Sequence, residues 1–331
     1  MIRRRQRQRS NAPAAVLAIV VILSSLFAFH SLIKSDRPTG CAGGDCAAIV
    51  STPPPPVPTP TPAPTQEVLA ASETRPPDIT AVSAAVIADD CDDMLYAKDA
   101  HHRLPPASIT KIMTAIVALE SSDPDDMVTV NIDGFFPGDA TVMGLQTGMQ
   151  LSLRDLLYGL LLPSGADAAV AIARYVAGDV PSFVNRMNAE ASDLGLQDTH
   201  FTNPHGLDAP GHYSSAYDMV MLGRYAMKNR LFAEIVNTKQ YTPNWSGPEL
   251  WNDNLLLWEY SGADGIKIGW TDNAGQTLVA TAQRDGHRVY LALFGSQDRY
   301  TDAIRLFDWA FETLAGEPAE GCDAVSADGS Q

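Results

Sequence analysis

Apolar residues recur at helical spacing directly after the pair Pro105-Pro106. The positions that carry this pattern are Ile109, Ile112, Met113, Ile116 and Val117. Because the prolines end the preceding element and Ser121-Ser122-Asp123-Pro124 follows, the pattern predicts a helix over residues 108–120. Nearly every face of this helix is apolar or small, which is typical of a buried helix. Ser108 and Lys111 are the polar exceptions.

The remaining periodicities predict an α+β fold with two lobes. Helical patterns cover residues 152–162, 167–177, 181–195, 215–227 and about 304–314. Strand patterns cover residues 81–87, 94–96, 128–130, 265–269, 276–282 and 288–294, with a hairpin turn at Asp285-Gly286. Strands come first, a block of helices follows, and strands with a closing helix come last. This order predicts an antiparallel sheet flanked by helices, in which the first hairpin joins the last strands and an all-α lobe is inserted.

The N-terminal segment is predicted to anchor the chain in a membrane. Residues 1–13 are basic, and residues 14–33 form an uncharged run long enough for a membrane-spanning helix. The basic tail would stay in the cytoplasm. A cleaved signal peptide is the alternative, but no clear A-x-A site follows and the run is long for a signal peptide. The body of the protein is then either tethered to the cell membrane on its outer side or secreted.

Residues 34–76 are predicted to form an extracytoplasmic linker. Eight of the 14 residues over 52–65 are proline, so this tract favours an extended polyproline stalk or a disordered spacer. As an extended stalk it would span about 43 Å. We place one folded domain at residues 77–316 and a C-terminal tail at residues 317–331.

Charge and cysteine content limit the partners and the compartment. The net charge is −16, and because residues 1–34 hold six positive charges and no acid, the rest carries −22. An acidic body argues against nucleic acid as a partner. Outside the cytoplasm the four cysteines can form disulfides, Cys41 with Cys46 and Cys91 with Cys322, and free thiols are the alternative for the second pair.

The predicted buried helix carries an arrangement that can activate a nucleophile. Ser108 and Lys111 are three residues apart and share a helix face. Burial favours the neutral amine of a lysine, which can act as a base, and backbone N–H groups at a helix start can stabilise an oxyanion. The alternative is an ordinary helix start, since Ser31-Leu32-Ile33-Lys34 shows the same spacing. Ser108 therefore needs partners from elsewhere in the chain.

Two further residues are candidate partners. Ser164 lies on the connection between two apolar helices, where an ordinary turn serine is the alternative. Lys267 lies on a strand bordered by Gly265 and Gly269, which suits close approach of a ligand, whereas an edge-strand lysine that discourages aggregation is the alternative.

The sequence gives no reason to expect a metal or another cofactor. His200, His205 and His212 show no HExxH or comparable ligand spacing. The four aspartates around Cys91 match no calcium-binding loop and are typical of a solvated turn.

Four segments together resemble the D-alanyl-D-alanine carboxypeptidases, the low-molecular-mass penicillin-binding proteins of bacterial cell walls. The segments are Pro106-Ala107-Ser108-Ile109-Thr110-Lys111-Ile112-Met113-Thr114-Ala115, Pro163-Ser164-Gly165-Ala166-Asp167-Ala168-Ala169, Asn203-Pro204-His205-Gly206-Leu207 and Asp264-Gly265-Ile266-Lys267-Ile268-Gly269. The resemblance covers about Ile79 to Leu314 and implies a penicillin-binding/β-lactamase-like fold. The Asn-Pro-His-Gly-Leu loop separates this family from β-lactamases.

The resemblance also implies a role for each candidate residue. Ser108 would attack the carbonyl between the two D-alanines of a peptidoglycan stem peptide, and Lys111 would take the serine proton. Ser164 would relay a proton to the leaving amine, and Lys267 would bind the substrate carboxylate. Backbone N–H groups of Ser108 and Trp270 would form the oxyanion hole. β-Lactam antibiotics would then acylate Ser108 as covalent inhibitors.

The sequence departs from the family pattern at two positions. Ala166 stands where the second motif usually has asparagine, and Ile268 where the third usually has threonine. Two lost hydrogen bonds would lower the rate by roughly tenfold to a few thousandfold. The expected function is a D-Ala-D-Ala carboxypeptidase, and the alternatives are a catalytically impaired wall-binding or regulatory homologue and a β-lactamase-like hydrolase. The last needs a Glu-x-x-Leu-Asn loop, and the chain contains no Leu-Asn pair.

Overall fold

The computed structural model describes residues 75–89, 94–132, 136, 140–245 and 247–315, all within one compact unit. The predicted cytoplasmic tail, membrane anchor and C-terminal tail, most of the predicted linker and all four cysteines lie outside these residues. Within the described ranges, no helix is both long enough and apolar enough to cross a membrane. The anchor, the disulfides and the domain limits therefore stay predictions.

Five antiparallel strands form the central sheet in the order β2-β1-β9-β8-β7. Their bounds are β1 Ser83–Ala88, β2 Met94–Lys98, β7 Ala263–Thr271, β8 Gly275–Arg284 and β9 His287–Ser296. Because β1 pairs with both β2 and β9, the first hairpin joins the last strands, as the sequence predicted. β7 forms one edge of this sheet. Two small sheets pair β3 Met127–Thr129 with β4 Gln150–Ser152, and β5 Gln240–Tyr241 with β6 Leu250–Trp251.

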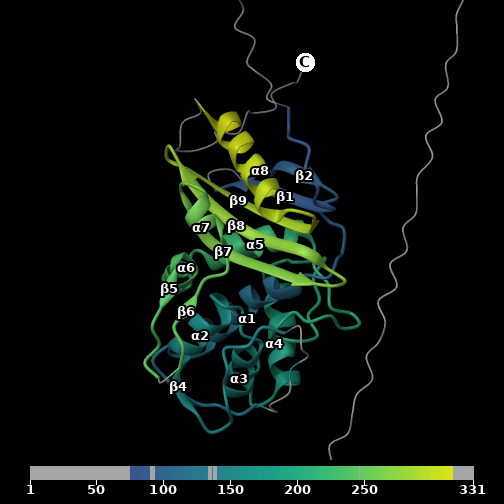
Figure 1. Cartoon of the computed structure of the whole chain (residues 1–331). Helices are drawn as coiled ribbons and strands as arrows, with labels where there is room; N and C mark the ends of the chain where they lie inside the picture. The colour runs from purple at the N-terminus through teal and green to yellow at the C-terminus, as the bar shows by residue number, and fades with distance from the viewer. Residues whose placement is uncertain (1–74, 90–93, 133–135, 137–139, 246, 316–331) are drawn as a thin grey trace, which may run out of the picture. The chain divides into compact units, whose positions relative to one another are not determined.

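Helices cover the sheet and form the second lobe (Figure 1). The 3-10 helix η1 Ala107–Thr110 precedes α1 Lys111–Ser121, α2 Leu153–Leu161, α3 Ala166–Ala177, α4 Val180–Asp193, α5 Ala216–Ala226, α6 Arg230–Asn237, α7 Leu256–Glu259 and α8 Arg299–Leu314. α8 and α5 both pack on β8 and β9, and α1 packs among α2, α3 and α4 in the helical lobe. The predicted insertion between the first hairpin and the last strands is confirmed and is mainly helical, but it is not all-α because it also contains the two small sheets.

Side-chain alternation along β9 separates two hydrophobic cores. Leu291 and Leu293 belong to the cluster on the α8 side of the sheet. Ala292 and Phe294 belong to the larger cluster that includes α5 and the helical lobe. Successive residues of a strand point to opposite faces, so both faces of this sheet are covered and the middle of β9 is apolar on both sides.

The predicted helix over 108–120 has a different first turn in the structure. η1 spans Ala107–Thr110, and the Lys111 N–H bonds to the Ser108 carbonyl three residues back. Ala107 has a φ of +52°, which no α-helix contains. The α-helix therefore begins at Lys111, and Ser108 lies in the tighter turn before it. α6, α7, β4, β5 and β6 were not predicted, and all of them except α6 have at most four residues each.

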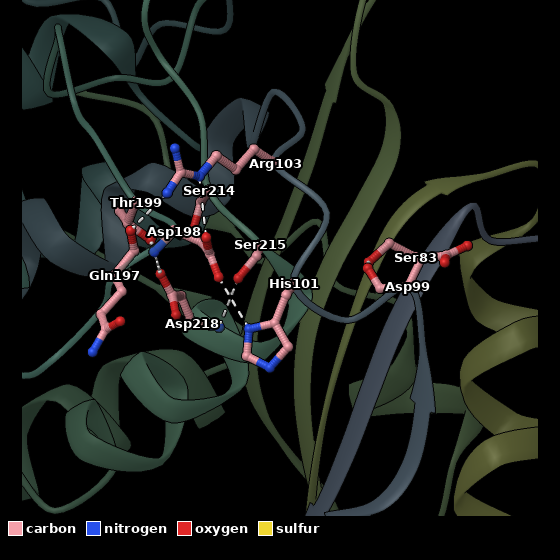
Figure 2. A network of polar contacts seen from close by, with 10 residues as sticks. All are labelled: Ser83, Asp99, His101, Arg103, Gln197, Asp198, Thr199, Ser214, Ser215 and Asp218. Carbon is pink, nitrogen blue, oxygen red and sulfur yellow. Dashed lines mark hydrogen bonds and ion pairs between the residues drawn. The ribbon is translucent and has the colours of Figure 1, made fainter.

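A polar network fixes the segment that leads from β2 to η1 (Figure 2). Arg103 Nε donates to Asp198 Oδ1 at 3.1 Å, and His101 Nδ1 lies 3.0 Å from Asp198 Oδ2. The backbone N–H of Asp198 donates to the buried Asp218 carboxylate at 2.7 Å, as does the Thr199 hydroxyl. The network joins this segment to the start of α5. It therefore holds the chain just before η1, the turn that carries the candidate nucleophile Ser108 and is called the nucleophile turn below.

Candidate active site

Ser108 and Lys111 make the direct contact that the sequence predicted. Lys111 Nζ donates a hydrogen bond to Ser108 Oγ at 2.8 Å. The Lys111 side chain lies at the start of α1 and is 2% exposed. Burial lowers the pKa of Lys111 well below its usual value of 10.5, and the positive charge of Lys267 lowers it further, while Asp167 partly opposes the shift. The amine therefore tends to be neutral and can accept a proton.

A second contact fixes the direction of the Lys111 amine. Lys111 Nζ also donates to the His205 carbonyl at 2.5 Å, and Thr114 Oγ1, on the same helix, donates to the Pro204 carbonyl at 2.6 Å. Gly206 lies so close to η1 that an added Cβ would overlap the Ala107 carbonyl. The loop therefore supports both Lys111 and the turn that carries Ser108.

The Asn203 side chain holds this loop in shape. Its Oδ1 accepts from the backbone N–H of Gly206 at 2.7 Å and of His205 at 3.2 Å, and its Nδ2 donates to the Leu207 carbonyl at 2.9 Å. The sequence showed this loop as a family motif without a role. The structure shows that it supplies a backbone acceptor, which no residue type in the motif could have indicated.

Two histidines lie beside the nucleophile turn. His212 Nδ1 accepts from the Thr202 N–H at 3.0 Å, and its Nε2 lies 2.9 Å from Thr110 Oγ1. Burial lowers the pKa of His212 to about 4 and that of His205 to about 3, so both are neutral at neutral pH. Both ring nitrogens of His212 are thus used within the protein.

Ser164 lies on the turn between α2 and α3 with a φ of +67°. Its hydroxyl is buried and has no hydrogen-bond partner among the described residues. Three residues further on, the buried Asp167 carboxylate accepts from the N–H groups of Met143, Gly144 and Leu145 at 2.9 Å each. α3, which follows this turn, packs against α1, and the charge of Asp167 partly opposes the lowering of the Lys111 pKa. Asp167 carried no signal that the sequence analysis used.

Lys267 lies on β7 and is 2% exposed. Its Nζ donates to the Ile268 carbonyl at 3.1 Å. Burial lowers the pKa of Lys267 to about 8, with Asp253 opposing and Arg299 assisting the shift. Arg299, at the start of α8, donates to the Gly269 carbonyl at 2.7 Å. Sequence analysis missed Arg299, because an arginine at a helix start is not by itself a signal.

β7 and β8 press directly on the nucleophile turn. An added Cβ on Gly269 would lie 2.7 Å from the Ser108 backbone nitrogen. Thr277 Oγ1, on β8, donates to the Pro106 carbonyl at 3.0 Å. The structure therefore brings Ser108, Lys111 and the strand that carries Lys267 together. Trp270 directly follows Gly269 on this strand, and its side chain is exposed.

The two departures from the family pattern lie close in sequence to Ser164 and Lys267. Ala166 begins α3, is buried, and donates its N–H to the Thr141 carbonyl at 2.8 Å. Ile268 is half-buried against the cluster on the α8 side of the sheet. Neither side chain can offer the hydrogen bond that asparagine or threonine would offer.

The fold and this site together place the chain in the class of penicillin-binding-protein folds. A crystal structure of the Streptomyces K15 DD-transpeptidase is 35% identical, with a TM-score of 0.67, and the match covers 72% of this chain and 99% of that one. Penicillin binding protein 6B from Escherichia coli is 37% identical with the same TM-score, covering 71% of this chain and 78% of that one. The predicted fold class is confirmed.

The chain belongs to the D-alanyl-D-alanine carboxypeptidase family, whose model matches residues 70–298. It is 34% identical over 249 residues to the D-alanyl-D-alanine carboxypeptidase DacF of Bacillus subtilis, covering 72% of this chain and 64% of that protein. It is 36% identical over 255 residues to DacB2 of Mycobacterium tuberculosis, covering 74% of this chain and 87% of that protein. The match thus spans just under two thirds of DacF.

Proposed function

We propose that the chain is a serine D-Ala-D-Ala carboxypeptidase that removes the terminal D-alanine from peptidoglycan stem pentapeptides. The observation that carries this proposal is the 2.8 Å hydrogen bond between the buried Lys111 amine and the Ser108 hydroxyl. A neutral amine at this distance can remove the serine proton and so activate the oxygen as a nucleophile. Family membership supports the same reaction.

In the first step, Lys111 accepts the Ser108 proton while Oγ attacks the carbonyl carbon between the two D-alanines. The backbone N–H groups of Ser108 and Trp270 stabilise the negative charge that develops on the carbonyl oxygen. Lys267 binds the terminal carboxylate and thereby orients the peptide. Ser164 relays the proton from Lys111 to the amine of the terminal D-alanine as the C–N bond breaks. The partnerless Ser164 hydroxyl supports this relay.

Hydrolysis completes the cycle. Water attacks the ester carbonyl at Ser108, Lys111 takes a proton from that water, and the tetrapeptide leaves as the Ser108 hydroxyl is restored. A β-lactam contains a strained amide, and we expect it to acylate Ser108 in the same way and to leave slowly.

Release of D-alanine from a synthetic pentapeptide tests the proposal directly. We expect release by the full chain and none by Ser108→Ala. A fluorescent penicillin should label the wild-type protein, and mass mapping should place the adduct on Ser108. No release and no adduct in the wild-type protein would refute the proposal.

An impaired wall-binding or regulatory homologue is the second candidate. Ala166 and Ile268 favour it, since each stands where the family usually has a side chain that can form a hydrogen bond. A penicillin adduct on Ser108 without D-alanine release would support this candidate. Rapid turnover of a chromogenic cephalosporin would instead indicate the β-lactamase-like alternative.

We also propose that residues 14–33 hold the domain on the outer side of the cytoplasmic membrane. The uncharged run and its basic flank support this location. In intact spheroplasts the domain should be found with the membrane. Protease added from outside should then digest it. Protection from the protease would contradict the proposal.

A further inference from the structure

One short segment of the chain contacts both the Ser108–Lys111 part of the candidate site and the strand that carries Lys267. The Pro204 and His205 carbonyls accept from α1, and Gly206 packs against η1. Two residues further on, Asp208 reaches the end of β7, the strand that carries Lys267. The segment therefore joins the side of the site that holds the base to the side that holds the substrate-binding strand.

The Asp208 carboxylate binds the turn between β7 and β8. Oδ1 accepts from Thr271 Oγ1 at 2.9 Å, and Oδ2 accepts from the Asn273 N–H at 3.4 Å. Thr271 is 4% exposed, and its hydroxyl also accepts from the Ala274 N–H at 3.1 Å. Hydrogen bonds to a charged acceptor are stronger than neutral ones, so this contact fixes the turn more firmly than an uncharged side chain would.

The same junction borders open space. A hollow of about 350 Å³ lies beside it, lined by Pro105, Asp208, Ala209, Pro210, His212 and Asn273. β7 is an edge strand, with β8 as its only strand neighbour in the described sheet. The Asp208 hydrogen bonds therefore link the loop to the end of β7 beside this hollow, next to the packing of Gly269 on η1.

We propose that Asp208 is a positioning residue for the oxyanion hole. Thr271 directly follows Trp270, whose N–H is one of the two proposed oxyanion donors. By holding Thr271, Asp208 sets the distance between the Trp270 N–H and Ser108, which the same segment supports through Gly206 and His205. This inference rests on the proposed function.

The test compares acylation by a fluorescent penicillin and turnover of a pentapeptide in the full chain. Oxyanion donors act on the transition state, so we expect Asp208→Ala and Thr271→Val each to lower the acylation rate and kcat about tenfold, with KM changed less than about twofold. The double variant should be no slower than either single variant, because both remove one interaction. Asp208→Asn and Thr271→Ser retain an acceptor and a donor, and should restore most of the rate.

Asp125→Ala is the matched control. It breaks another exposed carboxylate contact, the ion pair with Arg154 at 3.1 Å on the helical lobe, and should leave acylation unchanged. The inference would be overturned if Asp208→Ala kept the wild-type acylation rate, or if only KM increased. It would also be overturned if the loss of rate in the double variant equalled the product of the two single losses. If Asp208→Ala fails to fold, the comparison of Thr271→Val with Thr271→Ser tests the same hydrogen bond. A wild-type chain that neither labels nor releases D-alanine would instead refute the proposed function.

Discussion

Gly269 lies directly against the backbone nitrogen of Ser108. A Cβ on Gly269 would stand 2.7 Å from that nitrogen and 3.0 Å from the Cβ of Ala107. Both neighbours belong to the nucleophile turn, and neither can rotate away as a long side chain would. The glycine of the third motif is therefore required by close packing of the strand on the nucleophile.

Gly269→Ala should separate β7 from the nucleophile turn. Because small displacements of reacting groups are costly, we expect the rate of acylation by penicillin to fall about a hundredfold. Gly195→Ala is the control: it has a φ of +72° and nothing within 4 Å of an added Cβ. The control should cost about 1 kcal/mol of stability and leave acylation unchanged. A wild-type acylation rate in Gly269→Ala would show that β7 can move away from Ser108 without slowing the reaction.

Asn203→Leu should loosen the loop that presents the His205 carbonyl to Lys111. Three hydrogen bonds are lost, so we expect the free energy of unfolding to fall by about 1–3 kcal/mol and acylation to slow about tenfold. Thermal unfolding and penicillin labelling measure the two effects separately.

Asn188→Leu is the control for stability alone. Asn188 makes two comparable hydrogen bonds with the backbone of Phe201, at 2.8 and 2.9 Å. It should lose similar stability and keep its acylation rate. Equal slowing in both variants would mean that the Asn203 effect is a general loss of structure.

Ile268→Thr should raise kcat/KM on a D-Ala-D-Ala peptide about fivefold, because a hydroxyl worth about 1 kcal/mol returns to the position of the family's threonine. Ile268→Val has the shape of threonine without the hydroxyl and should show no gain. If both variants behave alike, the isoleucine does not account for any lost activity.

The pH dependence of kcat/KM should have two limbs. Activity rises with pH as Lys111 loses its proton, and its lowered pKa moves this limb well below 10.5. Lys267 has a pKa of about 8, so it becomes neutral above that pH, and binding of the substrate carboxylate weakens. kcat/KM reports the free enzyme, so its alkaline limb should fall near pH 8.

Lys267→Arg tests the assignment of the alkaline limb. Arginine stays charged, so the limb near pH 8 should disappear even if the affinity is lower. Lys98→Arg, which changes a lysine that donates to the Ala81 carbonyl at 2.6 Å, should keep the limb. An unchanged limb in Lys267→Arg would assign it to another group.

Much of the fold followed from the sequence because its signals are local. Two predicted helices begin at Ser152 and Ser215, and these hydroxyls accept hydrogen bonds from the backbone N–H groups of Asp155 and Asp218, at 3.0 and 3.1 Å. The buried helix was recognisable because it is apolar on nearly every face, whereas its 3-10 first turn was not, since Thr110 is held there by His212 from a distant segment.

The sequence by itself determined which residues are candidates for the reaction: Ser108 and Lys111 lie three residues apart, and Ser164 and Lys267 stand in motifs that resemble those of the family. Only the tertiary structure decided what activates and aligns them. The carbonyl that accepts from Lys111 lies 94 residues away, and the glycine against Ser108 comes from the far end of the sheet. Backbone carbonyls and close approaches belong to every residue type, so no side-chain pattern marks them until the chain is folded.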